Sequence, residues 1–198
     1  MNKKENIKPL GSPKVVYQWN IVQLVEQDMQ KWKKIKTFEY AERAPGVRIL
    51  VVNDTWKICL TRERRTELSE GKWWWDYRLP GGKVFDKLKK YNTFRKDEGD
   101  ILEIAKNAVQ RELEEETWLT PLSIKHLHTS PCGATMRWDL YYFLVEKFKQ
   151  HPDGQNLGFS ENIEVFWFTK EEVKEKCLNK SISEDRTVAV LLRYILTS

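Results

Sequence analysis

One helical segment, residues 101–117, constrains the fold of this chain more than any other feature, because its apolar side changes into a row of carboxylates. Small apolar residues such as Ala105 and Val109 recur there with the spacing of an amphipathic helix. Successive helix residues are rotated by about 100°, so Glu112 and Glu116 fall on the same side as these apolar residues. The side of the helix that should pack against a core therefore carries acids.

Glu115 continues the edge of the same side, whereas Glu114 is expected to point into solvent. The helix dipole disfavours carboxylates near a helix C-terminus, by roughly 0.3–1 kcal/mol each near the surface. Buried carboxylates need cations or hydrogen-bond donors, and Arg111 supplies only one charge. A divalent cation with oxygen ligands, magnesium in particular, would meet that need. The alternative is a solvated acidic face with local pairs such as Glu103 with Lys106.

The composition excludes several classes of protein. The chain has 198 residues, 40% of them hydrophobic, which is enough for one domain with appendages. Its formal charge of +5 is dispersed, which favours a polyanionic small substrate over nucleic acid as the main partner. The three cysteines have no metal-site spacing and predict reduced thiols. We see no signal sequence and no apolar run of membrane length, so we expect a cytoplasmic protein.

Strand patterns outnumber helix patterns along the chain. Residues 1–14 are expected to form a mobile tail, and the polar, basic segment 85–99 an exposed, mobile loop. The segments 47–52 and 55–62 predict a buried hairpin. Strands are expected at 15–26, 37–43, 47–52, 55–62, 73–79, 121–129, 137–148 and 162–169, and helices at 101–117, 171–179 and 185–196. Many strands with three helices predict an α+β fold with mixed sheets.

The residues around the acidic helix resemble the Nudix box, the signature of the Nudix hydrolases. LPGGKV at 79–84 is followed by Glu103 and, after seven further residues, by the motif Arg111-Glu112-Leu113-x-Glu115-Glu116. The family pattern is G-x5-E-x7-REUxEExGU, where U is aliphatic. This chain has about fifteen extra residues between Gly82 and Glu103. Trp118 replaces the family's glycine, which ends the helix in a left-handed conformation that is costly for tryptophan, so we expect a different helix end.

Residues 37–198 also resemble the ADP-ribose pyrophosphatase branch of that family. The resemblance implies a Nudix-type α/β/α sandwich at 44–198, with an insertion at about 85–99. A small strand segment at 15–43 would precede it and, as in that branch, form a homodimer. Met136 departs from the branch because it stands where the substrate loop usually carries an acid.

The resemblance implies a metal site and the residues that support it. The cation, Mg²⁺ or alternatively Mn²⁺, would be bound by Glu112, Glu115, Glu116 and the carbonyl oxygen of Gly81. Arg111 and Glu103 would orient this cluster, and Gly82 would shape the turn beside it.

The catalytic and substrate-binding residues are implied in the same way. Glu161, in the loop before the last strand, is a candidate general base, with Glu112 and Glu164 as alternatives. A guanidinium group suits a phosphate, and the arginines nearest the motifs are Arg43, Arg65 and Arg78.

Two functions are compatible with these residues. The first is a Mg²⁺-dependent pyrophosphohydrolase that cleaves the diphosphate bridge of a nucleoside diphosphate linked to another moiety, such as ADP-ribose or an NDP-sugar. The second is a Nudix-fold module that senses a nucleotide without turning it over. The retained Arg111, Glu112, Glu115 and Glu116 favour the enzyme.

Overall fold

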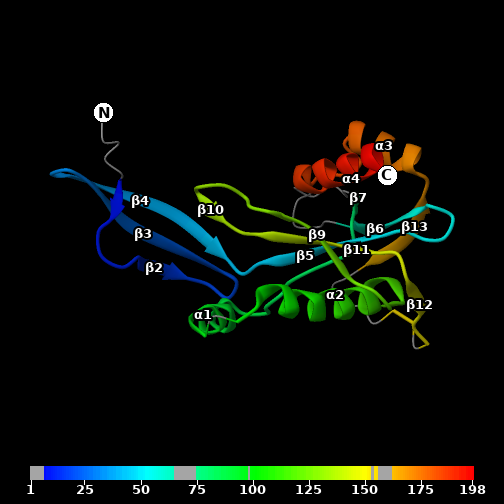
Figure 1. The fold of residues 1–198 in the computed structure, drawn as a ribbon, viewed down its shortest axis with the longest axis horizontal. Helices are drawn as coiled ribbons and strands as arrows, with labels where there is room; N and C mark the ends of the chain where they lie inside the picture. The colour runs from blue at the N-terminus through cyan, green and yellow to red at the C-terminus, as the bar shows by residue number, and fades with distance from the viewer. Residues whose placement is uncertain (1–6, 65–74, 98, 153, 156–161) are drawn as a thin grey trace. The chain divides into compact units, whose positions relative to one another are not determined.

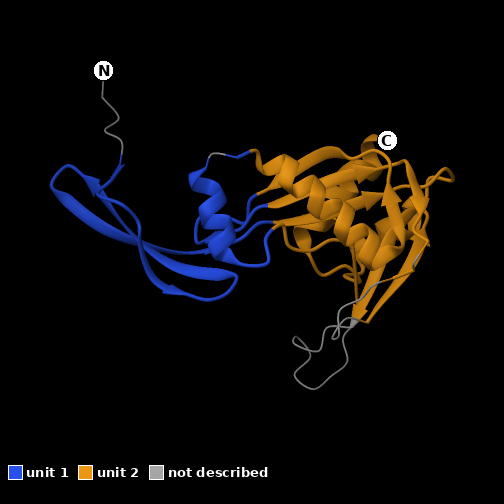
Figure 2. Ribbon diagram, turned by 90° about the horizontal axis from the view of Figure 1, so that it is seen from below, with its two compact units in different colours: residues 1–45, 85–99, 131–139 blue, residues 46–84, 100–130, 140–198 orange. Residues whose placement is uncertain are grey.

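The chain divides into two compact units, shown in the computed structural model of Figures 1 and 2. Unit 1 comprises residues 1–45, 85–99 and 131–139, and unit 2 comprises residues 46–84, 100–130 and 140–198. The structure describes residues 7–64, 75–97, 99–152, 154–155 and 162–198. Unit 1 thus includes residues 85–99 and 131–139, which were expected in the second domain. The domain boundary expected between residues 43 and 44 stays a prediction.

Unit 1 is built on a five-stranded sheet formed by β1 (Lys8–Pro9), β2 (Lys14–Gln18), β3 (Val22–Lys31), β4 (Lys34–Arg43) and β10 (Met136–Arg137). β3 and β4 form a long antiparallel hairpin. Its two-residue turn contains Trp32 at φ 58°, and tight hairpin turns of this kind need a positive φ. The single strand expected at 15–26 is two strands, because the chain turns where the Trp19 N–H donates to the Val22 carbonyl oxygen at 2.8 Å.

The segment expected to be an exposed loop at 85–99 contains a helix, α1 (Leu88–Lys96), so that prediction was wrong. Leu88, Tyr91 and Phe94 recur at a spacing of three residues, which is a helical signal that the surrounding basic residues obscured. Leu88 is fully buried, and its N–H donates to the carbonyl oxygen of Asn20 at 2.8 Å. The helix is therefore packed within unit 1 by an apolar anchor.

Unit 2 contains two three-stranded sheets and a strand pair. One sheet has the order β5–β11–β9, with β5 parallel to β11 and β9 antiparallel to it. The other has the order β13–β6–β7 and is antiparallel throughout. The strands are β5 (Gly46–Val51), β6 (Ile58–Arg64), β7 (Trp75–Arg78), β9 (Lys125–Ser130), β11 (Leu140–Val145) and β13 (Ile163–Phe168), with β8 (Leu119–Pro121) paired to β12 (Phe148–Gln150).

The buried hairpin predicted from 47–52 and 55–62 was wrong, because β5 and β6 lie in different sheets. A single bridge joins Val52 to Ile58. The side chain of Asn53 accepts hydrogen bonds from the backbone N–H groups of Thr55 and Lys57, at 3.0 and 2.9 Å. These side-chain bonds shape a turn that carries the chain from one sheet to the next.

Three helices of unit 2 were predicted and are confirmed as α2 (Ile101–Thr117), α3 (Lys170–Leu178) and α4 (Asp185–Thr197). The Asp100 side chain caps α2 by accepting from the Leu102 N–H at 2.9 Å. In Figure 1, α2 lies on one side of the sheets and α3 and α4 lie on the other, which confirms an α+β fold of the α/β/α sandwich type. No helix within the described ranges is long and apolar enough to cross a membrane.

Candidate active site

The C-terminal half of α2 lies against the glycine turn that follows β7. The Gly81 N–H donates to a carboxylate oxygen of Glu116 at 2.9 Å. A Cβ atom placed on Gly82 would lie 2.4 Å from a carboxylate oxygen of Glu112 and would displace that side chain. Gly81, at φ 143°, admits no side chain, because its Cβ would lie 2.3 Å from the Val47 carbonyl oxygen. The turn is fixed to β5, since the Val47 N–H donates to the Gly82 carbonyl oxygen at 2.9 Å.

The phase of α2 is the one that the sequence predicts. Ala105, Val109 and Leu113 are fully buried against the core, and the contacts with the glycine turn come from Glu112 and Glu116 on the same side. An apolar stripe that continues into carboxylates is therefore a real feature of the folded helix. It places two acids beside the backbone of a glycine-rich turn.

Glu116 is the more perturbed of the two acids. Its side chain is partly accessible, but the carboxyl group is enclosed, and burial raises its pKa to about 8. The nearby Glu112 carboxylate raises the pKa further, whereas the Gly81 N–H and the charges of Arg78 and Arg48 lower it. These counteracting groups do not restore the ordinary pKa, so the chain leaves the negative charge of this cluster under-compensated.

Arg111 links the acidic helix to the turn. Its Nη2 atom donates to the carbonyl oxygen of Lys83 at 2.8 Å and to a carboxylate oxygen of Glu112 at 2.7 Å. This geometry neutralises one acid and fixes α2 against the chain that follows the two glycines. It supports the predicted orienting role of Arg111, which stays a prediction.

Glu115 lies on the side of α2 next to the one that carries Glu112 and Glu116. It lines a cavity of about 580 Å³ on the neighbouring side of α2, together with Glu114 and Gln155. Glu114 accepts a hydrogen bond from the Gln110 side chain at 3.2 Å, this bond is exposed at the helix surface, and the expected direction of Glu114 into solvent stays a prediction. His151, Gly154 and Gln155 line the same cavity, an arrangement that helical periodicity alone cannot predict.

Trp118 ends α2 in the left-handed conformation, with φ 62° and ψ 22°. The expectation that tryptophan would force a different helix end was therefore wrong. The local cost is offset by hydrogen bonds to the last carbonyl groups, because the His151 N–H donates to the Trp118 oxygen at 2.6 Å and Gln155 Nε2 donates to the Glu116 oxygen at 2.5 Å. These two hydrogen bonds satisfy backbone carbonyl groups at the C-terminal end of α2. In a helix that ends at glycine, the backbone itself satisfies such groups.

The other acidic candidates lie in ion pairs or outside the described residues. Glu103 is exposed and pairs with Lys106 at 2.6 Å, as the solvated-face alternative proposed for that residue. Glu164, on β13, pairs with Arg62 of β6. Glu161 lies outside the described residues. The site therefore has Glu112 and Glu116 as its described acids at the glycine turn.

The three candidate arginines have separate environments. Arg78 of β7 is paired with Glu63, and its charge acts on Glu116. Arg43 belongs to unit 1, where its guanidinium group stacks on Trp138. Arg65 lies outside the described residues.

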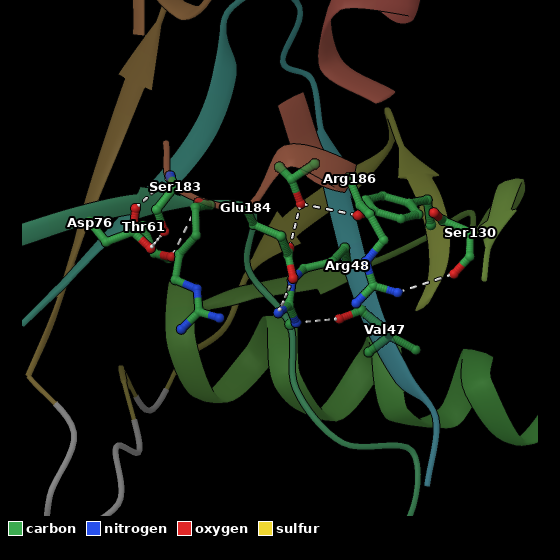
Figure 3. A network of polar contacts seen from close by, with 12 residues as sticks. Val47, Arg48, Thr61, Asp76, Ser130, Ser183, Glu184 and Arg186 are labelled. Atoms are coloured by element: carbon green, nitrogen blue, oxygen red, sulfur yellow. Dashed lines mark hydrogen bonds and ion pairs between the residues drawn. The ribbon is translucent and has the colours of Figure 1, made fainter. Parts of the chain in front are cut away.

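Sequence reasoning missed a second charged cluster in unit 2 (Figure 3). Arg48 donates to Glu184 through Nε at 2.9 Å and through Nη2 at 3.2 Å. Thr187 donates to the same carboxylate at 2.6 Å, and Tyr142 contacts Thr187 at 3.1 Å. A single arginine inside the apolar strand VRILVV was the available signal, because a buried charge needs a partner. The partner itself lies 136 residues further along the chain.

No three His, Cys, Asp or Glu side chains among the described residues are grouped so that they could hold a metal ion. The pair that does meet the glycine turn nevertheless fits a cation. Glu112 and Glu116 are oxygen donors, and the burial of Glu116 makes its ionised form costly unless positive charge is added.

The fold and this site define a class: an α/β/α sandwich in which an acidic helix packs against a Pro-Gly-Gly turn. The family model of the NUDIX domain matches residues 42–189, which is well over half of the chain. The chain therefore belongs to the Nudix family and is a Nudix hydrolase, as predicted. Nudix hydrolases act on nucleoside diphosphate-linked substrates and generally use divalent metal ions.

A solved structure described as an ADP compounds hydrolase is similar to this chain with a TM-score of 0.66 and 14% sequence identity. The similarity covers 96% of this chain and 92% of that chain. At this identity the likeness establishes the fold. No curated protein matches the sequence.

Proposed function

We propose that this Nudix hydrolase is a Mg²⁺-dependent pyrophosphohydrolase that cleaves the P–O–P bridge of a nucleoside diphosphate linked to a second group. ADP-ribose and NDP-sugars are the proposed substrates, and the fold of an ADP compounds hydrolase supports that choice. The observation that carries the proposal is the meeting of Glu112 and Glu116 with the Gly81–Gly82 turn, where the carboxyl group of Glu116 is enclosed beside a second acid and burial raises its pKa.

The proposed ligands of Mg²⁺, or of Mn²⁺ in its place, are Glu112, Glu115, Glu116 and the carbonyl oxygen of Gly81. When bound, the cation would neutralise the diphosphate and lower the pKa of a water molecule. Arg111 donates a hydrogen bond to the Glu112 carboxylate and would fix its direction.

The remaining roles follow from charge and position. Glu161 or Glu112 is the proposed base that takes a proton from the attacking water. Glu164 is less suited, because its carboxylate is engaged by Arg62. The proposed contacts with the substrate phosphates come from the arginines Arg43, Arg65 and Arg78.

The test is release of phosphate from a coupled phosphatase reaction, with ADP-ribose, NDP-sugars, dinucleoside polyphosphates and nucleoside triphosphates as substrates. Hydrolysis should require Mg²⁺ or Mn²⁺ and stop with EDTA. Preference for a nucleoside diphosphate linked to a second group is the expected result. Activity confined to triphosphates, or undiminished activity in EDTA, would contradict the proposal.

We also propose that the chain forms a homodimer through unit 1. Large apolar side chains on its strands are unusually accessible, and Val15, Tyr17, Leu24, Ile35 and Phe38 are each 42–57% exposed. Apolar surface concentrated in this way marks protein–protein contacts. Light scattering at micromolar concentration should give the mass of two chains, and a monomer would exclude the dimer.

A further inference from the structure

The turn that joins β3 to β4 forms a strongly basic end of the long hairpin in unit 1. Residues 31–36 have the sequence KWKKIK, and all of them are exposed. Strand β1, which lies alongside β3 in Figure 1, adds a further lysine, because Lys8 pairs with Gln30. Residues 29–38 contain no acidic residue. The fold thus gathers five lysines at one end of the hairpin. We call the following set the basic tip: Lys8, Lys31, Trp32, Lys33, Lys34 and Lys36.

The lysines of the basic tip repel one another. The strand register places Lys31 directly opposite Lys34, and like charges that face each other across two strands destabilise the pair. A lysine further along the same sheet is compensated, since Lys14 lies opposite Glu26 with 3.9 Å between its Nζ and a carboxylate oxygen. Within the part of the chain that the structure describes, no acid forms an ion pair with a lysine of the basic tip. An anionic partner would relieve this repulsion.

Trp32 lies in the turn of the basic tip and is unfavourable there in two ways. Its φ of 58° lies in the left-handed region, at the first residue of a two-residue hairpin turn where glycine is usual. Its side chain is 70% exposed, although tryptophan is among the largest apolar side chains. Its ring centre lies 5.9 Å from the Nζ of Lys31, which is an exposed contact. Residues held in an unfavourable backbone conformation cluster at functional sites, and an exposed ring at a turn can insert into a partner.

Two extended anionic partners suit a basic tip of this kind, a nucleic acid and a membrane surface. Its cations are all lysines, whereas arginine is the residue of choice for pairing with nucleic-acid phosphates. Proteins that bind single strands stack successive bases on several aromatic rings, and the basic tip has one ring. A tryptophan ring, with its apolar body and polar N–H, suits the boundary between water and lipid. Ile7, next to Lys8, is 52% exposed and adds aliphatic surface. These features favour the membrane.

We propose that the basic tip docks on an anionic membrane surface, with Trp32 inserted among the lipid headgroups. The lysine stems lie along the apolar boundary while their ammonium groups contact anionic headgroups. Clusters of roughly four to eight basic residues are typical of segments that bind anionic lipids, and each residue strengthens binding about fivefold. Such docking is peripheral and reversible, so it requires no membrane-spanning helix. It concerns where the protein acts and goes beyond the proposed hydrolysis, because the basic tip contains no residue of the acidic cluster.

Flotation of the full chain with lipid vesicles tests the proposal. One set of vesicles is phosphatidylcholine with about a third phosphatidylserine, which supplies the negative surface charge, and the other is phosphatidylcholine alone. The chain should float with the first set and not with the second. Added salt should weaken the binding, because it screens exposed charges. No binding to the anionic vesicles would overturn the proposal.

The double variant Lys31→Gln/Lys34→Gln removes the two lysines that face each other. It should bind anionic vesicles about twentyfold more weakly, since two contributions of about fivefold are lost, and it should be at least as stable because a repulsion is removed. The matched control, Lys125→Gln/Lys149→Gln, removes the same charge from exposed positions of unit 2 and should keep its affinity. An equal loss in the two variants would show attraction by net charge and overturn the proposal.

Trp32→Asn tests the insertion of the ring. Asparagine tolerates the left-handed conformation, so the fold should be kept while binding to anionic vesicles falls about tenfold. Trp56→Asn is the matched control, because Trp56 has a φ of 60° and is 60% exposed but belongs to unit 2. Brominated acyl chains should quench the tryptophan fluorescence of Trp56→Asn more than that of Trp32→Asn. Unchanged vesicle binding in Trp32→Asn would overturn the proposed insertion.

A single-stranded polythymidylate oligonucleotide separates the membrane from a nucleic acid. If the chain binds the oligonucleotide but not the anionic vesicles, and Lys31→Gln/Lys34→Gln loses that binding, the basic tip is a nucleic-acid contact and the proposal is overturned. Circular dichroism and light scattering of each variant separate a loss of binding from a loss of fold. Hydrolysis in solution should be the same in Lys31→Gln/Lys34→Gln and the unmodified chain, so a failure of hydrolysis in the unmodified chain bears on the proposed function only.

Discussion

Two enclosed glutamates of unit 2 have opposite electrostatic environments. Burial alone would raise the pKa of Glu184, but the charge and hydrogen bonds of Arg48, with a hydrogen bond from Thr187, hold it below the ordinary value. Burial raises the pKa of Glu116 to about 8, and its backbone hydrogen bond from Gly81 together with more distant arginines does not reverse the shift. The carboxylate of Glu184 is paired with a cation within the chain, whereas that of Glu116 is not compensated to the same degree.

The difference separates a structural ion pair from the proposed metal site. Arg48 and Glu184 join β5 to the N-terminus of α4, and each provides the charge that the other needs. Arg111 pairs with Glu112, and both Glu112 and Glu116 meet the glycine turn. The arginines whose charge acts on Glu116, Arg48 and Arg78, are paired with Glu184 and Glu63. The four predictions below test this contrast, beginning with the largest expected effect.

Arg48→Met should be the most damaging change to stability. The Arg48 side chain is only 6% exposed, and removing it leaves the Glu184 carboxylate buried without its cation. Loss of one partner of a buried ion pair costs about 3–5 kcal/mol. Urea unfolding would measure it, and the double variant Arg48→Met/Glu184→Gln should recover part of the loss. No recovery would show that packing, rather than charge, dominates at this position.

Glu116→Gln should be the most damaging change to catalysis. It keeps the shape of the side chain and removes the charge proposed to hold the cation. Activity should fall about a hundredfold or more, equivalent to about 3 kcal/mol of transition-state stabilisation. Glu115→Gln should behave in the same way, with a smaller fall at raised Mg²⁺. Glu114→Gln, which removes the same charge from the same helix, should stay near the unmodified rate, and an equal loss there would refute the assigned roles.

The same Glu116→Gln change should stabilise the metal-free protein at alkaline pH. Because the folded-state pKa is raised from 4.5 to about 8, the folded chain binds this proton more tightly than the unfolded chain does. Its free energy of unfolding should therefore fall as the pH rises from about 4.5 to about 8. The full shift is equivalent to about 5 kcal/mol, and the partial accessibility of the side chain reduces this value. At pH 9 in EDTA the variant should therefore be more stable by roughly 2–4 kcal/mol. If the free energy of unfolding depends on pH in the variant as it does in the parent, Glu116 is not the group responsible for that dependence.

Glu103→Gln should have the smallest effect. Its pair with Lys106 is exposed, and exposed ion pairs contribute about 0–1 kcal/mol. Thermal unfolding should change little. The activity measurement matters more, because a fall of tenfold or more would support the orienting role that the family resemblance gives to Glu103, while an unchanged rate would leave it as a surface pair.

The sequence by itself determined the features that depend on neighbouring residues. The apolar and acidic side of α2 follows from helical periodicity, so the burial of Val109 and Leu113 and the position of Glu116 could be predicted. The Gly81–Gly82 turn could be predicted in the same way, because it depends on two adjacent glycines. The same periodicity was present in α1, at Leu88, Tyr91 and Phe94, and could have predicted that helix despite its basic residues.

Only the tertiary structure decided the features that join distant parts of the chain. Helical phase cannot show that His151, Gly154 and Gln155 line one cavity with Glu114 and Glu115, or that His151 and Gln155 satisfy the end of α2 at Trp118. The order of the strands brings Arg48 to Glu184 and separates β5 from β6. A local pattern fixes the direction of a side chain on its own helix, whereas its partner depends on how the sheets and connecting segments pack.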